Sequence, residues 1–303
     1  MNSIGRIFRV SIWGESHGAG VGVTIDGVKP GLALSEADFE TDLARRRSGV
    51  PGTTPRHESD VPELLSGVFE GHTTGAPITV FFRNTDVRSA DYDSIREKPR
   101  PGHADAAAAV KFNGFNDYRG GGQFSGRMTV ALVAAGVVAK KMLPGASFNA
   151  DIAELEGVSS KDMFDSVVIS AVKDGDSLGG VVQCCIDGIP AGVGEPFWDS
   201  VEGCIAHALF AIPGVKGVEF GEGFESARKK GSEQTHEGGV SGGICNGERV
   251  IFRVAFKPAS SVQKNGIGGR HDACYALRCP VIVEAAAALV LADLSIISGN
   301  GRE

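Results

Sequence analysis

Apolar segments alternate with glycine-rich turns and helical patterns along the first half of the chain. The predicted strands cover residues 7–13, 21–25, 65–69 and 78–83, and the predicted helices cover residues 35–47, 103–112 and 125–143. Residues 14–20 form a glycine-rich connection between the first two strands, and residues 51–55 predict a loop. Ser35 and Asp38 have the spacing of a capping box, which marks the start of the first helix.

Three segments of the second half match segments of the first half in the same order. The matched pairs are residues 25–28 with 186–189, residues 66–68 with 241–243, and Arg127 followed by the apolar run 130–135 with Arg278 followed by the run 281–286. The first pair is separated by 186 − 25 = 161 residues, and a helix is expected after each member, over 35–47 and about 195–210. The series indicates a duplicated β–helix–β–helix unit, roughly residues 1–150 and 160–303 of a single domain, with chance similarity of Gly/Ala/Val-rich segments as the alternative. Two such units would pack as one molecule, in layers of helices and mostly antiparallel sheets.

Composition and charge narrow the class of protein. Hydrophobic residues make up 42% of the chain and charged residues 22%, as is typical of a globular protein. Glycine accounts for 43 of the 303 residues, about twice its average share, so many positions can adopt backbone conformations that are closed to other residues. The net charge is 30 − 37 = −7. Because nucleic-acid-binding proteins are usually basic, we expect no nucleic-acid partner.

We expect a cytoplasmic protein without a membrane span. The most apolar run, residues 279–294, is interrupted by Glu284 and Asp293 and is shorter than the ~20 residues that a span needs. The N-terminal residues 1–9 are charged and polar, unlike the apolar core of a signal peptide. The six cysteines include no Cys-x-x-Cys pair, which favours reduced thiols. Without that spacing or a His-x-x-x-His pair, we expect no zinc site.

The first candidate site is Gly14-Glu15-Ser16-His17-Gly18, which fits the Gly-x-Ser-x-Gly pattern of a serine hydrolase. That nucleophile needs a strand, a sharp turn and then a helix, whereas the residues that follow here predict another strand. The context therefore argues against a hydrolase that uses Ser16. His17 lies among glycines, where a histidine in a turn without a catalytic role is the alternative to a functional one.

Two other histidines share a pattern with arginine and aspartate. Arg100-Pro101-Gly102-His103-Ala104-Asp105 and Gly269-Arg270-His271-Asp272 each place an arginine close before the histidine and an aspartate close behind it. A guanidinium beside an imidazole keeps the ring neutral or makes it more acidic, unless a carboxylate or a bound anion offsets it. Such a group suits proton donation or phosphate binding. The alternative for residues 103–105 is a helix start without catalytic meaning.

The arginines indicate a small anionic ligand. Arg45, Arg46 and Arg47 end the first helix, and five more arginines lie beside Gly, His or Asp: Arg100, Arg119, Arg127, Arg270 and Arg278. Guanidinium groups bind phosphate and carboxylate through paired hydrogen bonds. The glycines after Arg119 expose backbone amides that also favour an anion. Lys257-Pro258-Ala259-Ser260-Ser261 offers hydroxyls and amides to a phosphate or a polar cofactor edge, although a plain turn explains these five residues equally well.

Taken in order along the chain, these motifs resemble the chorismate synthase family. The matching segments are Phe8-Arg9-Val10, Gly14-Glu15-Ser16-His17-Gly18, Arg45-Arg46-Arg47, residues 65–71, Asn84-Thr85-Asp86, residues 100–105, residues 117–122, residues 216–219, Lys257-Pro258 with Ser260-Ser261, and residues 269–272. They extend from residue 8 to about residue 293, nearly the whole chain, and a chance match at this density is not credible.

The resemblance implies a fold and an activity. The fold would be α+β, a β-α-β sandwich of two pseudo-symmetric halves with helices packed between mostly antiparallel sheets, assembled as a homotetramer. The activity would be the anti-1,4-elimination of phosphate from 5-enolpyruvylshikimate 3-phosphate to give chorismate, the last common step of the shikimate pathway of aromatic amino acid biosynthesis. The family requires reduced FMN (FMNH2) for this lyase reaction, although the reaction has no net redox change.

The resemblance also implies roles for individual residues. His17 would protonate the reduced flavin, His103 would protonate or hold the departing phosphate, and Asp272 would assist proton removal through flavin N5. The implied substrate-binding residues are Ser16, Arg46, Arg100, Arg127 and Arg270, and Arg46 would also contact NADP. The implied flavin-binding residues are Ser125, Gly126, Arg127, Gly242, Lys257, Pro258, Ala259, Ser260, Ser261 and Arg270.

Some segments depart from the family pattern. Gln123-Phe124 stands where the family commonly has an arginine, so one arginine of the flavin loop is absent. The loop after Arg47 is a residue short and lacks the second arginine that the family ties to nicotinamide-nucleotide binding, which argues against an intrinsic flavin reductase activity. These changes leave an alternative open, a homologue that binds flavin and anions but has lost turnover.

Overall fold

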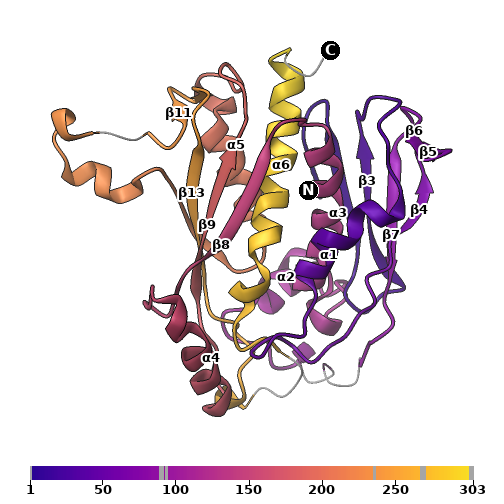
Figure 1. The fold of residues 1–303 in the computed structure, drawn as a ribbon. Helices are drawn as coiled ribbons and strands as arrows, with labels where there is room; N and C mark the ends of the chain where they lie inside the picture. The colour runs from indigo at the N-terminus through magenta and orange to yellow at the C-terminus, as the bar shows by residue number, and fades with distance from the viewer. Residues whose placement is uncertain (1, 89–91, 93–94, 235–236, 267–270, 300–303) are drawn as a thin grey trace.

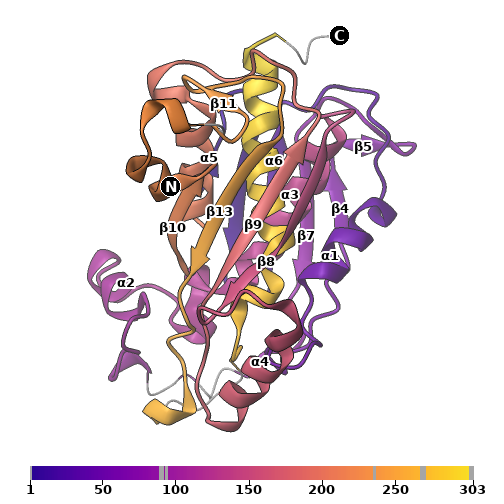
Figure 2. The same cartoon turned by 60° about the vertical axis from the view of Figure 1, so that its left-hand side comes forward.

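Two antiparallel sheets enclose a layer of helices in the computed structural model (Figure 1). The structure describes residues 2–88, 92, 95–234, 237–266 and 271–299. Turning the molecule brings β8 (Ser147–Leu155), β9 (Gly180–Asp187) and β13 (Val250–Phe256) in front of α3 (Thr129–Lys141) and α6 (Pro280–Ile297) (Figure 2). The predicted α+β class with helices between antiparallel sheets is confirmed.

The first sheet contains the strands that the first half predicts. Its strand order is β1 (Ser3–Ile4), β2 (Arg9–Gly14), β3 (Gly20–Asp26), β7 (Ile78–Arg83) and β4 (Glu63–Ser66). The strand predicted over residues 65–69 is interrupted at Gly67, where φ is +83° and the backbone turns away from the sheet. Beyond this glycine, β5 (Val68–Phe69) pairs with β6 (His72–Thr73) in a small separate hairpin.

The second sheet repeats the strand order of the first. Its order is β10 (Val215–Phe220), β13, β9 and β8, and the hairpin of β11 (Val240–Ser241) and β12 (Ile244–Cys245) lies apart from it. Across the sheets, the spatial order β2-β3-β7-β4 corresponds to the order β8-β9-β13-β10. In each series the third strand along the chain lies at the edge and the fourth lies between it and the second. Duplication of a unit stays a proposal, which this shared order supports.

The helices begin where local capping allows. The remaining helices are α1 (Glu40–Arg46), preceded by a 3-10 turn at Glu36–Phe39, α2 (Asp105–Lys111), α4 (Phe164–Lys173) and α5 (Val201–Phe210). The predicted capping box is present, because Asp38 Oδ2 accepts the amide hydrogen of Ser35 at 2.7 Å. The helix predicted from about residue 195 begins only at Val201, because the Ser200 hydroxyl caps it by accepting the amide hydrogen of Gly203 at 3.0 Å.

Helix α6 forms the centre of the core and lies beside α3. Over its 18 residues the mean hydropathy is 2.1, so it is long and apolar enough to cross a membrane, and 83% of it is buried inside the protein. The helix is longer than the apolar run of residues 279–294 because it continues to Ile297. Two acidic residues interrupt its apolar surface. Asp293 accepts the backbone amide hydrogens of residues 6, 7 and 8 at 2.8–2.9 Å, which fixes the N-terminal turn against the helix.

The second acidic residue, Glu284, lies in the helix layer between two basic side chains. Its carboxylate accepts hydrogen bonds from both terminal nitrogens of Arg45, at 2.8 and 2.7 Å, and from Lys140 Nζ at 2.8 Å. The amide of Ala150 on β8 donates to it at 2.9 Å. Glu284 therefore joins α1, α3 and β8 to the central helix.

Candidate active site

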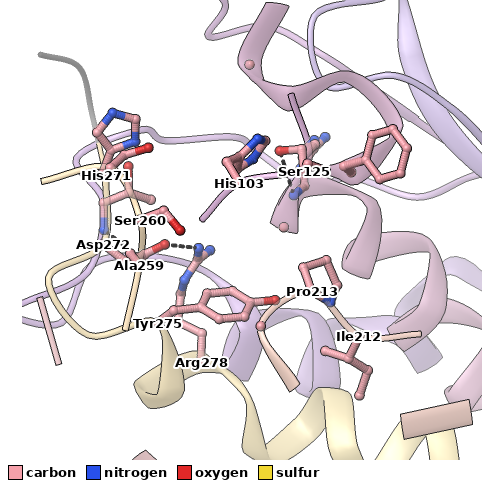
Figure 3. Close-up of a pocket in the computed structure, with 18 of the residues that line it drawn as sticks. His103, Ser125, Ile212, Pro213, Ala259, Ser260, His271, Asp272, Tyr275 and Arg278 are labelled. Atoms are coloured by element: carbon pink, nitrogen blue, oxygen red, sulfur yellow. Dashed lines mark hydrogen bonds and ion pairs between the residues drawn. The ribbon is translucent and has the colours of Figure 1, made fainter. Parts of the chain in front are cut away.

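A cavity of about 550 Å³ lies where segments from both halves of the chain meet. Its walls come from the end of α1, the start of α3, the segment before β10, the loop after β13 and the segment before α6. The predicted site residues that line it are Arg46, Arg100, His103, Ser125, Gly126, Arg127, Lys257, Pro258, Ala259, Ser260, Ser261 and Asp272. Several of them face one space in Figure 3. Eight arginines and lysines line the cavity against three aspartates and glutamates, so it favours an anionic ligand.

His103 lies beside both a guanidinium and a carboxylate. Its Nδ1 is 2.6 Å from Asp105 Oδ1 and 3.1 Å from Arg100 Nη2. Arg100 and Asp105 form a buried ion pair with an Nε–Oδ2 distance of 2.8 Å. Burial alone would raise the pKa of Asp105, but the hydrogen bonds from Arg100 and His103 hold that pKa well below its ordinary value. The offsetting carboxylate considered from the sequence pattern is therefore present.

Two serines and a lysine of the second half hold the segment that carries His103. Lys257 Nζ donates to the carbonyl oxygen of Gly102 and to Ser260 Oγ, both at 2.6 Å, and Ser260 Oγ donates to the same carbonyl at 2.9 Å. Arg100 Nη1 donates to Ser261 Oγ at 3.3 Å. These contacts fix the loop after β13 against residues 100–105 of the other half.

His17 does not line the cavity, but only backbone separates it from the residues that do. Gly120 and Gly121 have φ of +57° and +83°, which other residues rarely adopt. A Cβ built on Gly120 would lie 2.6 Å from His17 Nε2, and one built on Gly121 would lie 3.4 Å from His103 Nε2. The two imidazoles thus pack against successive glycines. His17 also meets the ring of Tyr92 edge-on, at 5.0 Å between centroids.

Asp272 lies in the cavity wall with both carboxylate oxygens engaged. Oδ2 accepts from Arg278 Nη2 at 2.7 Å, and Oδ1 accepts the amide hydrogen of Thr54 at 2.9 Å (Figure 3). Two predicted residues need separate mention. Gly242 lies in the turn between β11 and β12, outside the cavity lining, and Arg270 falls outside the described residues.

Arg46 and Arg127 converge on a carboxylate that no sequence motif singled out. Asp60 is fully buried and accepts hydrogen bonds from Arg46 Nη2 and Arg127 Nη1. Burial alone would raise the pKa of Asp60, but the two arginines outweigh this and lower it. Arg127 has further anchors in Asn84 Oδ1 at 3.0 Å and the carbonyl of Arg83 at 3.2 Å, whereas the buried Nε of Arg46 has no partner among the described residues.

Ser16 is buried and does not line the cavity. Its hydroxyl accepts a hydrogen bond from Arg56 Nη1 at 2.8 Å, and its carbonyl accepts from Arg56 Nη2 at 3.0 Å. Glu58 completes the cluster through an ion pair with Arg56 at 2.6 Å. Strand β3, rather than a helix, follows Ser16, so the structure lacks the strand–turn–helix context of a hydrolase nucleophile.

One wall of the cavity is apolar. Phe124, Phe210, Ile212, Pro213 and Tyr275 form it. The buried hydroxyl of Tyr275 has no partner among the described residues, and burial raises the pKa of Tyr275 well above its ordinary value. A flat aromatic ligand that carries anionic groups fits a cavity with one apolar and one basic wall.

Sequence patterns assign no role to several residues of the cavity. They are Arg56, Glu58, Asp60 and Tyr275. The only local signal is the alternation of charged with other residues, which places charges at positions 56, 58 and 60 directly after the predicted loop. This alternation could have identified the charged cluster but not its partners, because those lie on segments distant in sequence.

Comparison with known proteins gives one consistent result. Residues 8–296 match the family model described as chorismate synthase. A chorismate synthase of Chitinophaga pinensis is 52% identical, covering 98% of this chain and 97% of its own length. One from Aeropyrum pernix is 42% identical, covering 98% and 93%. A crystal structure of chorismate synthase superposes with a TM-score of 0.75 at 27% identity, over 97% of this chain and 92% of the other.

Proposed function

The chain belongs to the chorismate synthase family, and we propose that it eliminates phosphate from 5-enolpyruvylshikimate 3-phosphate to give chorismate. The observation that carries this proposal is the cavity in which His103, Asp272 and arginines of both halves meet. In this 1,4-elimination, the C–O bond to phosphate breaks and phosphate leaves with the electron pair. A proton is lost from the carbon in the 1,4 relationship to the C–O carbon, and its C–H electrons go into the new double bond. Negative charge therefore develops on the departing phosphate, where fixed cations stabilise it.

The described side chains can perform the phosphate half of this reaction. Arg46, Arg100 and Arg127 present guanidinium groups to the cavity, and His103 offers Nε2 for proton transfer to the leaving oxygen. The roles of His17 and Asp272 stay predictions. The ion pair with Arg278 holds the Asp272 carboxyl group at the cavity wall.

Reduced FMN fits the apolar and basic walls of the same cavity. Eight of the residues implied for it line that cavity: Ser125, Gly126, Arg127, Lys257, Pro258, Ala259, Ser260 and Ser261. When bound, the reduced flavin would supply electron density to the electron-poor centre formed as phosphate leaves. Contacts of Arg46 with NADP, assembly as a homotetramer and a cytoplasmic location are likewise proposals that rest on family membership.

The alternative, a binding homologue without turnover, rests on the segment of Gln123 and Phe124. Both line the cavity, and Gln123 Oε1 accepts from Asn2 Nδ2 at 3.3 Å, so no guanidinium enters there. Arg100, Arg127 and Lys257 remain in the lining. These cations favour retained catalysis over binding alone.

The test is anaerobic incubation of the protein with dithionite-reduced FMN and 5-enolpyruvylshikimate 3-phosphate. We expect release of phosphate together with chorismate absorbance. No phosphate above a control with flavin alone would refute the proposal, and tight binding of both ligands without product would favour the alternative.

His103→Ala should lower kcat by ~10²–10⁴ if the imidazole is a general acid. His72→Ala, on β6 and outside the cavity, is the matched control and should leave kcat unchanged.

A further inference from the structure

Asp105 holds two cavity residues at once. Oδ2 accepts hydrogen bonds from the backbone amide of Arg100 at 3.0 Å and from its Nε at 2.8 Å. Oδ1 accepts from Arg100 Nη2 at 2.9 Å and meets His103 Nδ1 at 2.6 Å. The Asp105 side chain is only 5% exposed. All of its acceptor capacity is therefore directed at these two residues, and none faces the cavity.

The contact between Asp105 and His103 determines which ring nitrogen carries a proton. Because the pKa of Asp105 lies well below its ordinary value, the carboxylate is ionised and can only accept. Nδ1 must then be the donor in the 2.6 Å contact. Arg100 cannot accept a proton from the ring. One of its two Nη2 hydrogens has Oδ1 as its acceptor, and a protonated Nδ1 cannot accept the other. In the neutral ring this leaves Nε2 unprotonated.

Nε2 is the ring atom left for a ligand. It has no hydrogen-bond partner in the described part of the chain, and it packs where a Cβ on Gly121 would be 3.4 Å away. The main-chain carbonyl of Gly102, held by Lys257 and Ser260, keeps the segment in place. Ring orientation is thus set from the Nδ1 side by Asp105.

We propose that Asp105 is a positioning residue that holds His103 Nδ1–H and so makes Nε2 the atom that exchanges a proton with the ligand. Only the identity of that ligand rests on the proposed function. With an imidazolium ring, the Nε2 proton moves to the departing phosphate oxygen and the ring remains as the neutral Nδ1–H form. The charge of Asp105 stabilises the cation before transfer and keeps its hydrogen bond afterwards, as orienting carboxylates do for other catalytic histidines.

The chain offers a matched control. Asp117 accepts from the backbone amide, Nε and Nη2 of Arg119 at 3.0, 2.9 and 2.7 Å, the same three contacts that Asp105 receives from Arg100. Neither Asp117 nor Arg119 lines the cavity. Asp105→Asn and Asp117→Asn therefore each remove a carboxylate with the same three arginine contacts, from a buried pair at Asp105 and from a more exposed pair at Asp117. Of the two carboxylates only Asp105 bonds to His103.

The experiment measures the tautomer of the His103 ring and the turnover of the enzyme in the same set of variants. The ¹⁵N spectrum of histidine-labelled protein without ligand reports the tautomer of each ring, and His103 is assigned by its absence in His103→Gln. Wild type and Asp117→Asn should show neutral His103 as Nδ1–H. Asp105→Asn should shift the ring toward Nε2–H, because Arg100 competes for the single remaining oxygen. Its kcat should fall by ~10², a larger change than that in KM. Asp117→Asn is the control for the tautomer alone, because Asp117 lies close enough to His17 to interact with it electrostatically.

Each outcome decides the inference. An Nε2–H tautomer in wild type, or an Asp105→Asn protein with unchanged tautomer or unchanged kcat, would overturn it. Loss of thermal stability alone, without a tautomer shift, would assign Asp105 a purely structural role and also overturn it. If Asp105→Asn does not fold, the wild-type spectrum decides. A tautomer shift in a protein that releases no phosphate would leave the inference standing and refute the proposed reaction.

Discussion

Asp60 in the cavity and Glu284 in the helix layer are built alike. Each is a buried carboxylate between two basic side chains: Arg46 and Arg127 for Asp60, Arg45 and Lys140 for Glu284. In both, burial alone would raise the pKa of the carboxyl, and the neighbouring cations lower it instead. Arg45 and Arg46 are adjacent on α1 and point to different clusters.

The two clusters differ in whether their basic side chains keep hydrogen-bond donors without an acceptor. Glu284 accepts four hydrogen bonds, including one from the backbone of β8. In the other cluster the buried Nε of Arg46 has no partner among the described residues, and both arginines line the cavity. Burial lowers the pKa of Arg46, and Asp60 opposes that shift, which helps to keep the guanidinium charged. The same kind of charge cluster therefore joins elements of the fold in one place and holds two guanidinium groups in the cavity lining in the other.

The largest expected effect is on stability at Glu284. Glu284→Gln leaves Arg45 and Lys140 without their shared anion. Breaking a buried ion pair from one side costs about 3–5 kcal/mol, but the two cations are 41% and 22% exposed and water screens them, so we take the lower end, about 3 kcal/mol. We expect the free energy of unfolding in urea to fall by that amount while kcat/KM stays within a few-fold of wild type. Glu63→Gln, which breaks the exposed pair with Arg83, is the control and should cost about 1 kcal/mol or less. A large loss of kcat/KM at unchanged stability would contradict the comparison.

The next largest effect is on kcat/KM, and it should differ between the adjacent residues Arg45 and Arg46 of α1. Arg46→Gln removes a cavity guanidinium and should lower kcat/KM by ~10², the scale for losing one charged donor to a developing anion. Arg45→Gln should lower the midpoint of thermal unfolding and leave kcat/KM nearly unchanged. The pair of variants is compared in the phosphate-release assay and by thermal unfolding. Equal losses of kcat/KM in both would show that the two clusters do not have separate tasks.

The smallest effect is the pH dependence of stability. Because the pKa of Glu284 is lower in the folded protein than in the unfolded chain, its contribution is present above the ordinary pKa and is lost as pH falls through the folded pKa. Each unit of that lowering corresponds to about 1.4 kcal/mol. Urea unfolding measured from pH 6 down to pH 2 should therefore show a shallower decline for Glu284→Gln than for wild type. Parallel curves for the two proteins would contradict this assignment.

Much of the fold follows from local sequence patterns. The alternation in β13 buries Val250, Phe252, Val254 and Phe256, and the capping box at Ser35 and Asp38 starts the first helix region where it was expected. Errors fall at element ends and at Gly67, which divides the predicted strand over residues 65–69 between two sheets. The helix that begins at Val201 rather than near residue 195 starts late because a single side-chain cap decides the boundary, which an apolar pattern does not encode.

The sequence by itself determined the layered α+β class and the family resemblance, and most of the site residues that the resemblance implies line the cavity. The class and the resemblance depend on local periodicity and on motifs whose members lie close together in the chain. Only the tertiary structure decided that Asp60 joins Arg46 to Arg127, that His17 and His103 share a run of glycines, and that Gly242 lies outside the cavity lining. These relations join residues far apart in sequence. They arise from the packing of two sheets on common helices, which no local pattern records.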